Sequence, residues 1–269
     1  CTDSEGDYTL RKFCNYLKTD LKRSVCSMKF LISIALMICV LLFSTLEGIA
    51  LDTNVLYVFS IVMYGMPAMM ILVCGAIAFA DSFCEDIEHK YVIQQVIRGD
   101  IERYVSARIL SIFFVTMLSV TFGMFLFASI LHFKLAWVDV SGLQYDHIIH
   151  AGGLRFFLMH KWYSLYYFCY GIQYSILAGI LALWAAYFSM FISNRMLVLS
   201  APMIQYYFMD YILSALSSGT LSLAAIFSPS NNIFLNDFLS VLLVVMIAVM
   251  NLILLRKLLI RKLRRKICE

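Results

Sequence analysis

Six long apolar stretches, separated by short charged segments, constrain this chain more than any other feature of its sequence. The apolar core of a bilayer is about 30 Å thick, and roughly 20 helical residues are needed to cross it. We therefore expect an all-α integral membrane protein with six transmembrane helices. The predicted spans cover residues 30–50, 55–80, 105–131, 163–191, 196–216 and 238–255.

The basic residues are distributed unevenly between the segments that separate these spans. Cytoplasmic segments of membrane proteins carry an excess of Lys and Arg. With a cytoplasmic N-terminus, 18 of the 21 Lys and Arg residues fall on the inner side, and only Lys134, Arg155 and Lys161 fall outside. We predict a multi-pass protein of the cell membrane with both termini in the cytoplasm.

The composition leaves no room for a soluble domain of ordinary size. Hydrophobic residues make up 62% of the 269 residues and charged residues 14%. The longest segment outside the spans has about 31 residues, fewer than usually fold alone. We predict a single transmembrane domain over residues 1–269. The net charge of +4 fits membrane orientation and attraction to anionic lipid headgroups, so no nucleic-acid partner is expected.

Sequence signatures of catalysis are missing. No glycine precedes a lysine, so there is no phosphate-binding loop of the Gly-Lys-Ser/Thr kind, and no Gly-x-Ser-x-Gly motif occurs. The eight cysteines include no Cys-x-x-Cys pair, and none falls in an outer loop, so neither a zinc site nor a disulfide framework is expected. We expect no catalytic residue, no metal and no cofactor in this chain, and no ATP hydrolysis by the chain itself.

Two cytoplasmic segments flank the spans. Within residues 1–29, apolar residues recur at helical spacing among basic ones, which predicts an amphipathic helix in the inner membrane interface. A solvated polar lead-in is the alternative. The basic segment 256–269 is predicted to continue the last span along the inner surface. The apolar positions of the N-terminal helix are Leu10, Phe13, Leu17, Leu21 and Met28.

The charged segment 81–104, between the second and third spans, has the pattern of a helix, a turn and a second helix. A short helix is predicted to end at Arg98, where Gly99 is free to take the left-handed C-terminal conformation. Asp100 can then cap the helix that runs through Arg108 into the third span. A rigid protrusion of this kind suits the docking of a partner.

Polar residues inside the fifth span are candidate functional residues, because burying them in lipid is unfavourable. One interpretation is that Gln205, Tyr206 and Asp210 face a water-filled path or another subunit. The alternative is that Gln205 and Gln173 form hydrogen bonds between neighbouring helices, while Asp210 extends to the outer interface.

Small residues and prolines predict how the spans pack. Gly171, Ser175 and Gly179 recur every four residues, a pattern that lets another helix approach closely. Packing inside the chain is expected for this row rather than a subunit interface. Pro67 in the second span and Pro202 in the fifth predict kinks. Methionines cluster around Pro67, and methionine suits either a surface for varied apolar ligands or ordinary core filling.

The two outer loops differ in character. The loop 132–162 carries His147 and His150, which could hold a metal, although the zincin order His-Glu-x-x-His is absent. In the loop 217–237, the apolar segment Leu221–Phe227 is too short to cross the membrane. A re-entrant or interfacial hairpin before the last span satisfies its backbone better than a free loop.

Between the second and third spans, Asp86-Ile-Glu88 is followed by Arg98-Gly-Asp-Ile-Glu-Arg103-Tyr104-Val-Ser-Ala-Arg108. This acidic segment, followed by an Arg and a basic-aromatic step into the third helix, resembles the membrane subunit of a type 2 ABC exporter. The six-span layout and the hairpin before the last span are similar to that family over nearly the whole chain. Arg108 stands where the family often has Lys, and Glu88-His-Lys-Tyr91 replaces its frequent Glu-x-Gly-Thr.

The resemblance implies a separate ATP-binding cassette subunit, which would bind ATP and Mg, and a second permease subunit, identical or homologous. Residues Glu85 to Ile97 would form a coupling helix that docks on the ATP-binding subunit. The translocation path would lie between the two permease subunits, formed by the first, second and fifth spans. The implied docking residues are Glu85, Asp86, Glu88, Tyr91, Gln94, Ile97 and Arg98. The implied path residues are Met63, Met66, Met70, Gln205, Tyr206 and Asp210.

An exporter subunit is therefore the expected function. The expected cargo is an amphipathic peptide or another hydrophobic compound, because the inferred path contributes Met, Tyr and Phe and few charges. An integral membrane enzyme that uses the outer histidines, and an immunity or sensor protein without transport, are the alternatives. An exporter subunit would have a cognate ATP-binding protein, whereas the enzyme would carry a bound metal.

Overall fold

The computed structural model describes residues 2–46, 54–79, 101–140, 142–192, 194–217, 222–230 and 236–268. All regular structure within these ranges is helical, in agreement with the all-α prediction. The helices are α1 (Thr2–Val25), α2 (Met28–Leu46), α3 (Val55–Tyr64), α4 (Met66–Ile77), α7 (Ile101–His132), α8 (Leu143–Ala151), α9 (Arg155–Met159), α10 (Tyr163–Phe188), α11 (Arg195–Leu216), α12 (Leu223–Phe227) and α13 (Asp237–Cys268).

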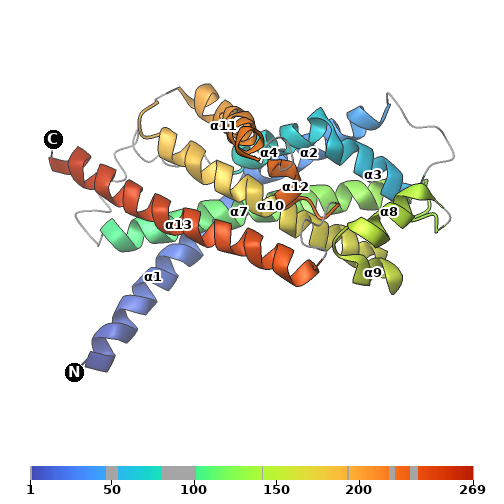
Figure 1. Cartoon of the computed structure of the whole chain (residues 1–269). Helices are drawn as coiled ribbons and strands as arrows, with labels where there is room; N and C mark the ends of the chain where they lie inside the picture. The colour runs from blue at the N-terminus through green and yellow to red at the C-terminus, as the bar shows by residue number, and fades with distance from the viewer. Residues whose placement is uncertain are drawn as a thin grey trace.

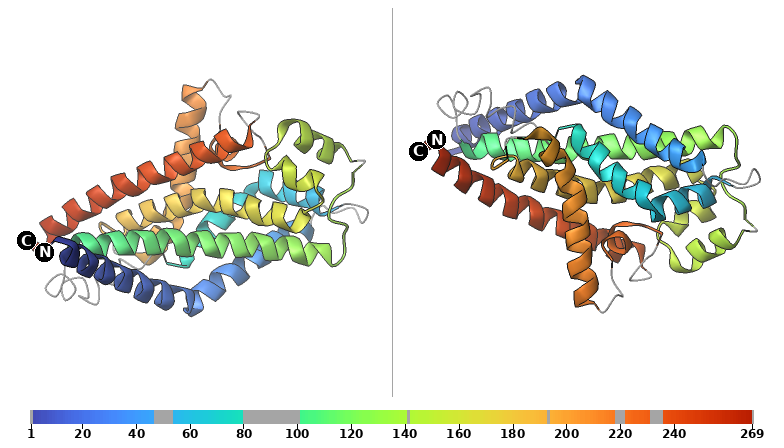
Figure 2. Two further views of the ribbon diagram at one scale, coloured as in Figure 1. Left: turned by 90° about the horizontal axis from the view of Figure 1, so that it is seen from below. Right: turned by 90° about the horizontal axis from the view of Figure 1, so that it is seen from above.

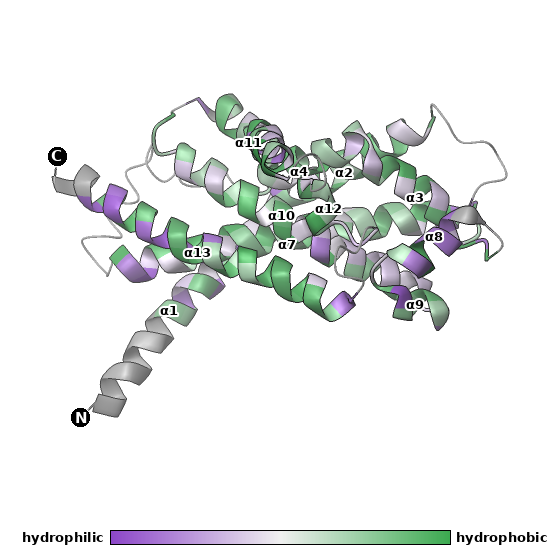
Figure 3. Cartoon of the chain, in the orientation of Figure 1, coloured by the Kyte–Doolittle hydropathy of each residue, from purple (hydrophilic) through white to green (hydrophobic). Residues whose placement is uncertain are grey.

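Five helices, α2, α7, α10, α11 and α13, are long and apolar enough to cross a membrane. The pair α3 and α4 adds a sixth span if the two cross as one bent unit. Apolar residues cover most of the length of the bundle, and hydrophilic residues concentrate toward its ends (Figure 3). The architecture fits a multi-pass membrane protein.

Helices α7 and α10 lie side by side along the centre of the bundle (Figure 1). A Cβ added at Gly171 of α10 would lie 3.3 Å from the Thr121 Cα of α7, and one added at Gly179 would lie 2.7 Å from the Phe113 ring. Between these two contacts, Thr121 Oγ1 donates to Ser175 Oγ at 3.1 Å. The prediction that this row of small residues packs within the chain is confirmed.

The predicted second span is broken in two at Gly65. Helices α3 and α4 are bent by 77° relative to each other. Pro67 lies in the first turn of α4, and proline has no backbone N–H with which to continue the hydrogen-bond ladder of α3. The predicted kink is therefore confirmed, as a break with its corner at Gly65.

Helix α11 runs across the bundle. Figure 1 shows it nearly end-on, and both views of Figure 2 show it crossing the direction of α7, α10 and α13. It has the predicted length of the fifth span and contains Pro202. Its buried stripe, which includes Val198, Ala201 and Tyr206, packs on α4 and α10, and most of its remaining surface is exposed. The predicted six-span arrangement is therefore not confirmed.

The last helix continues well beyond the predicted span. Helix α13 has 32 residues and includes the basic tail as far as Cys268. Leu255, Leu259 and Leu263 recur every four residues and are buried in the core. Beside them, Arg264 Nη2 lies 2.6 Å from Glu102 Oε1 in the first turn of α7. The basic tail therefore continues the last span as the same helix (Figure 1).

The connection between α7 and α10, predicted as a loop, contains the short helices α8 and α9. These lie at the end of the bundle where α3 and α10 begin (Figure 1). The Ala136 carbonyl accepts from the Val55 N–H at 2.9 Å, so the connection satisfies a free donor at the start of α3. The Gly153 N–H donates to the Pro229 carbonyl at 2.7 Å. The connection is therefore tied both to α3 and to the segment that follows α12.

Candidate functional site

The sequence predicts two functional regions, a docking segment and a translocation path. The docking residues Glu85, Asp86, Glu88, Tyr91, Gln94, Ile97 and Arg98 lie outside the described residues, as does most of the predicted coupling region 81–104. The structure does describe both borders of this segment. These are α4 with the turn through Phe79 on one side, and α7 from Ile101 on the other.

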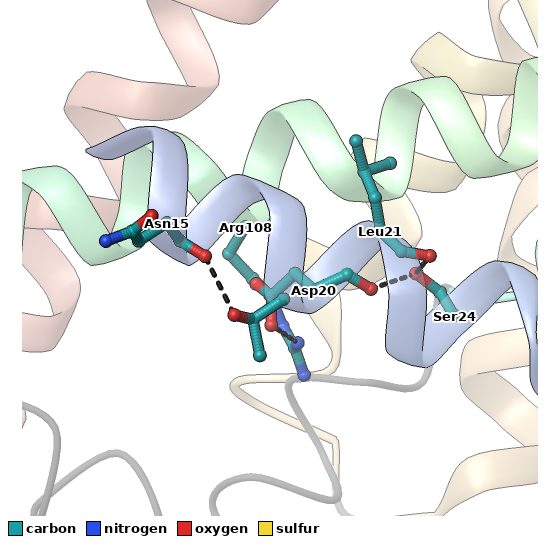
Figure 4. Close-up of polar contacts among 6 residues, drawn as sticks. Asn15, Asp20, Leu21, Ser24 and Arg108 are labelled. Atoms are coloured by element: carbon teal, nitrogen blue, oxygen red, sulfur yellow. Dashed lines mark hydrogen bonds and ion pairs between the residues drawn. The ribbon is translucent and has the colours of Figure 1, made fainter. Parts of the chain in front are cut away.

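A buried ion pair connects these borders to the N-terminal helix. Arg108 of α7 is 1% exposed, and its Nη1 lies 3.1 Å from Oδ1 of Asp20 in α1. Figure 4 shows the Arg108 side chain reaching Asp20 between the two helices. The guanidinium carbon also lies 4.6 Å from the centre of the Phe79 ring, within the range of a cation–π contact. We call Asp20, Phe79 and Arg108 the junction, because they connect α1, the end of α4 and α7.

The amphipathic pattern of α1 positions Asp20. Leu17 and Ser24 lie three and four residues from Asp20, on the same side of the helix, and Leu21 follows Asp20 directly. Leu21 packs against the core, Ser24 is buried, and the Ser24 hydroxyl donates to the Asp20 carbonyl (Figure 4). Asp20 is not among the residues predicted from the sequence. A carboxylate on the apolar face of a helix is nevertheless a signal for a buried partner, because an unpaired charge there is costly.

Among the described residues, α1 and the C-terminal part of α13 carry many exposed basic side chains. The N-terminus, the start of α7 and the C-terminal part of α13 lie at one end of the bundle (Figure 2). Lys262 Nζ of α13 lies 4.5 Å from the centre of the Phe191 ring, which follows α10. The exposed basic side chains of α1 and α13 are Lys18, Lys22, Arg23, Arg256, Lys257, Arg261 and Arg264.

The structure brings predicted path residues of the second and fifth spans onto neighbouring helices. Helix α4 packs against α11, and the Tyr207 hydroxyl donates to Met66 Sδ at 3.4 Å between them. Met66 is 65% exposed and Met70 is also exposed, whereas Met63 is buried in the core. Met66 and Met70 thus lie on an open surface of the single chain, together with Tyr207, which the sequence did not single out, while Met63 fills the core.

Gln205 and Tyr206 face the inside of the chain. Tyr206 is buried, and both amide atoms of Gln205 are shielded from solvent without a hydrogen-bond partner among the described residues. The alternative prediction of a hydrogen bond to a neighbouring helix is therefore not met for Gln205 in this part of the chain. By contrast, Asn251 in α13 does have a partner on a neighbouring helix, since its Oδ1 accepts from Trp184 Nε1 of α10 at 3.1 Å.

Asp210 has a role that neither prediction anticipated. Its Oδ1 accepts from the N–H of Leu223, the first residue of α12, at 2.7 Å. The Ser222 hydroxyl accepts from the Ala225 N–H at 3.1 Å in the same turn. Two side-chain oxygens therefore satisfy donors at the start of α12. Asp210 fixes this short helix to α11.

Gln173 of α10 borders a small cavity near the start of α13. It is 6% exposed, and its Nε2 has no hydrogen-bond partner within the described ranges. The cavity is lined by Gly153, Leu154, Gln173, Pro229, Asp237, Ser240 and Val241. None of the six predicted path residues lines it, so this cavity is separate from the predicted path.

The histidines of the connection between α7 and α10 lie on α8 and directly after α9. His147 and His150 are exposed on α8, and His160 Nδ1 lies 2.9 Å from the Phe156 carbonyl. Among the residues whose positions the structure describes, no group of three or more His, Cys, Asp or Glu side chains is arranged to hold a metal. No geometry in that part of the chain favours the metalloenzyme alternative.

Neither a protein-family model, nor a curated protein sequence, nor a solved structure matches the chain. The geometry of the junction and of the α4–α11 contact therefore carries the functional interpretation.

Proposed function

We propose that the chain is the membrane-spanning permease subunit of an ATP-driven exporter. It docks a separate ATP-binding subunit, where ATP and Mg are bound, and pairs with a second permease subunit, identical or homologous, to enclose the translocation path. The cargo is an amphipathic peptide or another hydrophobic compound. The termini and the coupling region 81–104, which contains the docking residues, are on the cytoplasmic side of the cell membrane.

The distribution of charge supports this orientation. Most of the exposed basic side chains in the described ranges belong to α1 and to the C-terminal part of α13, and the terminal ends of these two helices lie at the same end of the bundle (Figure 2). An excess of Lys and Arg marks the cytoplasmic side of a membrane protein. The docking segment leads into the start of α7, at the same end.

The junction is the observation that carries the proposal. A docking segment can drive transport only if its movement is transmitted to the membrane-spanning helices. Arg108 belongs to α7 and contacts Phe79 on the α4 side and Asp20 on α1. Breaking a buried ion pair by removing one partner costs about 3–5 kcal/mol. We therefore expect α1, the end of α4 and α7 to move together when the docking segment moves.

The open surface of α4 and α11 supports the position of the path. Met66, Met70 and Tyr207 are exposed there. Methionine offers an adaptable apolar surface, which suits a hydrophobic or amphipathic cargo. A second permease subunit that faces this surface encloses these side chains.

Reversal of the charge in the docking segment tests the proposal. We expect the double variant Asp86→Lys, Glu88→Lys to lose the ATP-hydrolysing protein that co-purifies with the wild-type chain from native membranes, and to lose nucleotide-driven efflux of a labelled amphipathic peptide. Asp146→Lys is the matched control, since Asp146 is exposed on α8 at the opposite end of the bundle. An ATPase that binds the double variant as well as the wild type, or a wild-type chain that purifies with no such partner, contradicts the proposal.

A further inference from the structure

The short helix α9 and the residue before α10 present large apolar side chains to the outside of the molecule. Phe156, Met159 and Trp162 are 52%, 61% and 54% exposed. The rings of Phe156 and Trp162 lie together, with centroids 6.1 Å apart and an angle of 82° between their planes. On the other side of α9, Leu158 is buried in the core. We call Phe156, Met159 and Trp162 the α9 patch.

The backbone holds the α9 patch in one orientation. Leu154 before α9 and Lys161 after it have positive φ angles of 59° and 60°. Residues other than glycine rarely adopt this left-handed conformation, and they keep it only where the surroundings enforce it. The Trp162 N–H donates to the Phe157 carbonyl at 2.8 Å. The patch is therefore a built feature of the turn and not a flexible loop tip.

The position of the patch along α10 identifies what covers it. Helix α10 begins at Tyr163, directly after Trp162, and is long and apolar enough to cross a membrane. The first residues of a spanning helix lie at the boundary between lipid and water, where Trp side chains concentrate. Lys161 beside the patch is exposed, and a lysine at this depth can reach lipid phosphates while its alkyl stem stays in apolar surroundings.

We infer that the α9 patch is an anchor that inserts into the lipid interface at the α8–α9 end of the bundle. Its partner is the bilayer, with the apolar side chains among the acyl chains and Lys161 at the headgroups. The anchor holds α10 at a fixed depth through the connection at Trp162. This inference requires that α10 crosses the membrane, and it does not depend on the exporter function.

Quenching of tryptophan fluorescence by brominated lipids tests the anchor. The chain has three tryptophans, so Trp137→Phe with Trp184→Phe leaves Trp162 as the only one. In phosphatidylcholine–phosphatidylglycerol vesicles, we expect lipids brominated near the headgroup to quench Trp162 about twofold more strongly than lipids brominated near the chain end. A chain that retains only Trp137, which is stacked between His132 and Tyr167, is expected to be quenched weakly by both.

Replacement of apolar residues of the α9 patch with Asp is a second test of the anchor. Phe156→Asp with Met159→Asp is expected to reduce the quenching of Trp162 by headgroup-brominated lipid at least to the level of Trp137. Val140→Asp is the matched control, since Val140 is an exposed apolar residue of the same connection outside the patch; it should leave the quenching unchanged. In the chain that retains only Trp162, quenching by aqueous iodide without quenching by brominated lipid overturns the inference. Shielding of Trp162 from both quenchers also overturns it, because a second copy or another protein segment then covers the patch.

Discussion

Arg108 of α7 and Asp20 of α1 form an ion pair of 3.1 Å across a separation of 88 residues in sequence, with Arg108 almost completely buried. A guanidinium in such a place is stable only with a partner, since burying an isolated charge is strongly unfavourable. The pair therefore fixes where α1 lies on α7. It also places a rigid contact directly beside the segment that we propose as the docking site.

Removal of one partner of this pair should be far more harmful than removal of both. Asp20→Ala removes a carboxylate partner from a buried guanidinium and is expected to lower the free energy of unfolding by about 3–5 kcal/mol. The double variant Asp20→Leu, Arg108→Met should recover most of this loss, because buried ion pairs can be replaced by apolar residues of similar volume. Reversible unfolding in mixed micelles measures both. Glu102→Gln, which breaks the exposed pair with Arg264, is the control and should cost less than about 1 kcal/mol. Equal losses in the free energy of unfolding for Asp20→Ala and Glu102→Gln would show that the buried ion pair is no more stabilising than the exposed one.

Gln205 should be replaceable without loss of stability. Its buried amide has no partner in the described chain, and an unsatisfied buried polar group costs about 1–3 kcal/mol. We expect Gln205→Met to raise the unfolding temperature in detergent. Asn251→Leu is the matched comparison and should lower it, because Trp184 Nε1 then loses its acceptor. A lower unfolding temperature for Gln205→Met would instead indicate that the Gln205 amide has a hydrogen-bond partner.

The contact between α7 and α10 should not tolerate a methyl group at Gly179. The added Cβ would lie 2.7 Å from the Phe113 ring, and overpacking of a core typically costs about 1–3 kcal/mol. Phe113→Leu makes room at this point. Gly179→Ala should therefore be less destabilising in the Phe113→Leu background than in the wild type, as shown by a double-mutant cycle of unfolding free energies. Strict additivity would show that the two residues do not meet.

Asp210→Ala should release the start of α12. The Leu223 N–H then loses its acceptor, and we expect amide exchange over residues 222–227 to become about tenfold faster, as expected for the loss of roughly 1.4 kcal/mol. Asp210→Asn keeps an oxygen acceptor at the same place and should retain most of the protection. Hydrogen–deuterium exchange with mass spectrometry measures this. Protection that is the same in Asp210→Ala as in the wild type would show that α12 is held by other contacts.

Much of the bundle could be predicted from local pattern. Hydropathy locates the long helices because bilayer thickness sets their length. The spacing of Gly171, Ser175 and Gly179 predicts the packing surface of α10, because small residues act through close contact. Pro67 predicts the break between α3 and α4, since the missing N–H is a property of that residue alone.

The remaining features depend on partners that are distant in the chain. Hydropathy gives the length of α11 and not its direction, which follows from what Val198 and Tyr206 pack against. Asp20 can pair with Arg108, and Asp210 can accept from the Leu223 N–H, only after the helices have assembled. The sequence pattern of α1 predicts that Asp20 has a partner, but it does not identify Arg108 as that partner.

Helix α13 has a mechanical consequence. It is one uninterrupted rod of 32 residues, or about 48 Å at 1.5 Å per residue. One end starts beside the Gln173 cavity, and near the other end Arg264 forms an exposed ion pair with Glu102 in the first turn of α7. The helix is bonded to α10 between its two ends, through Asn251 and Trp184, so a tilt of the basic end about this contact would move Asp237 and Ser240 the opposite way. A change in the width of the Gln173 cavity would then report a movement of the basic tail.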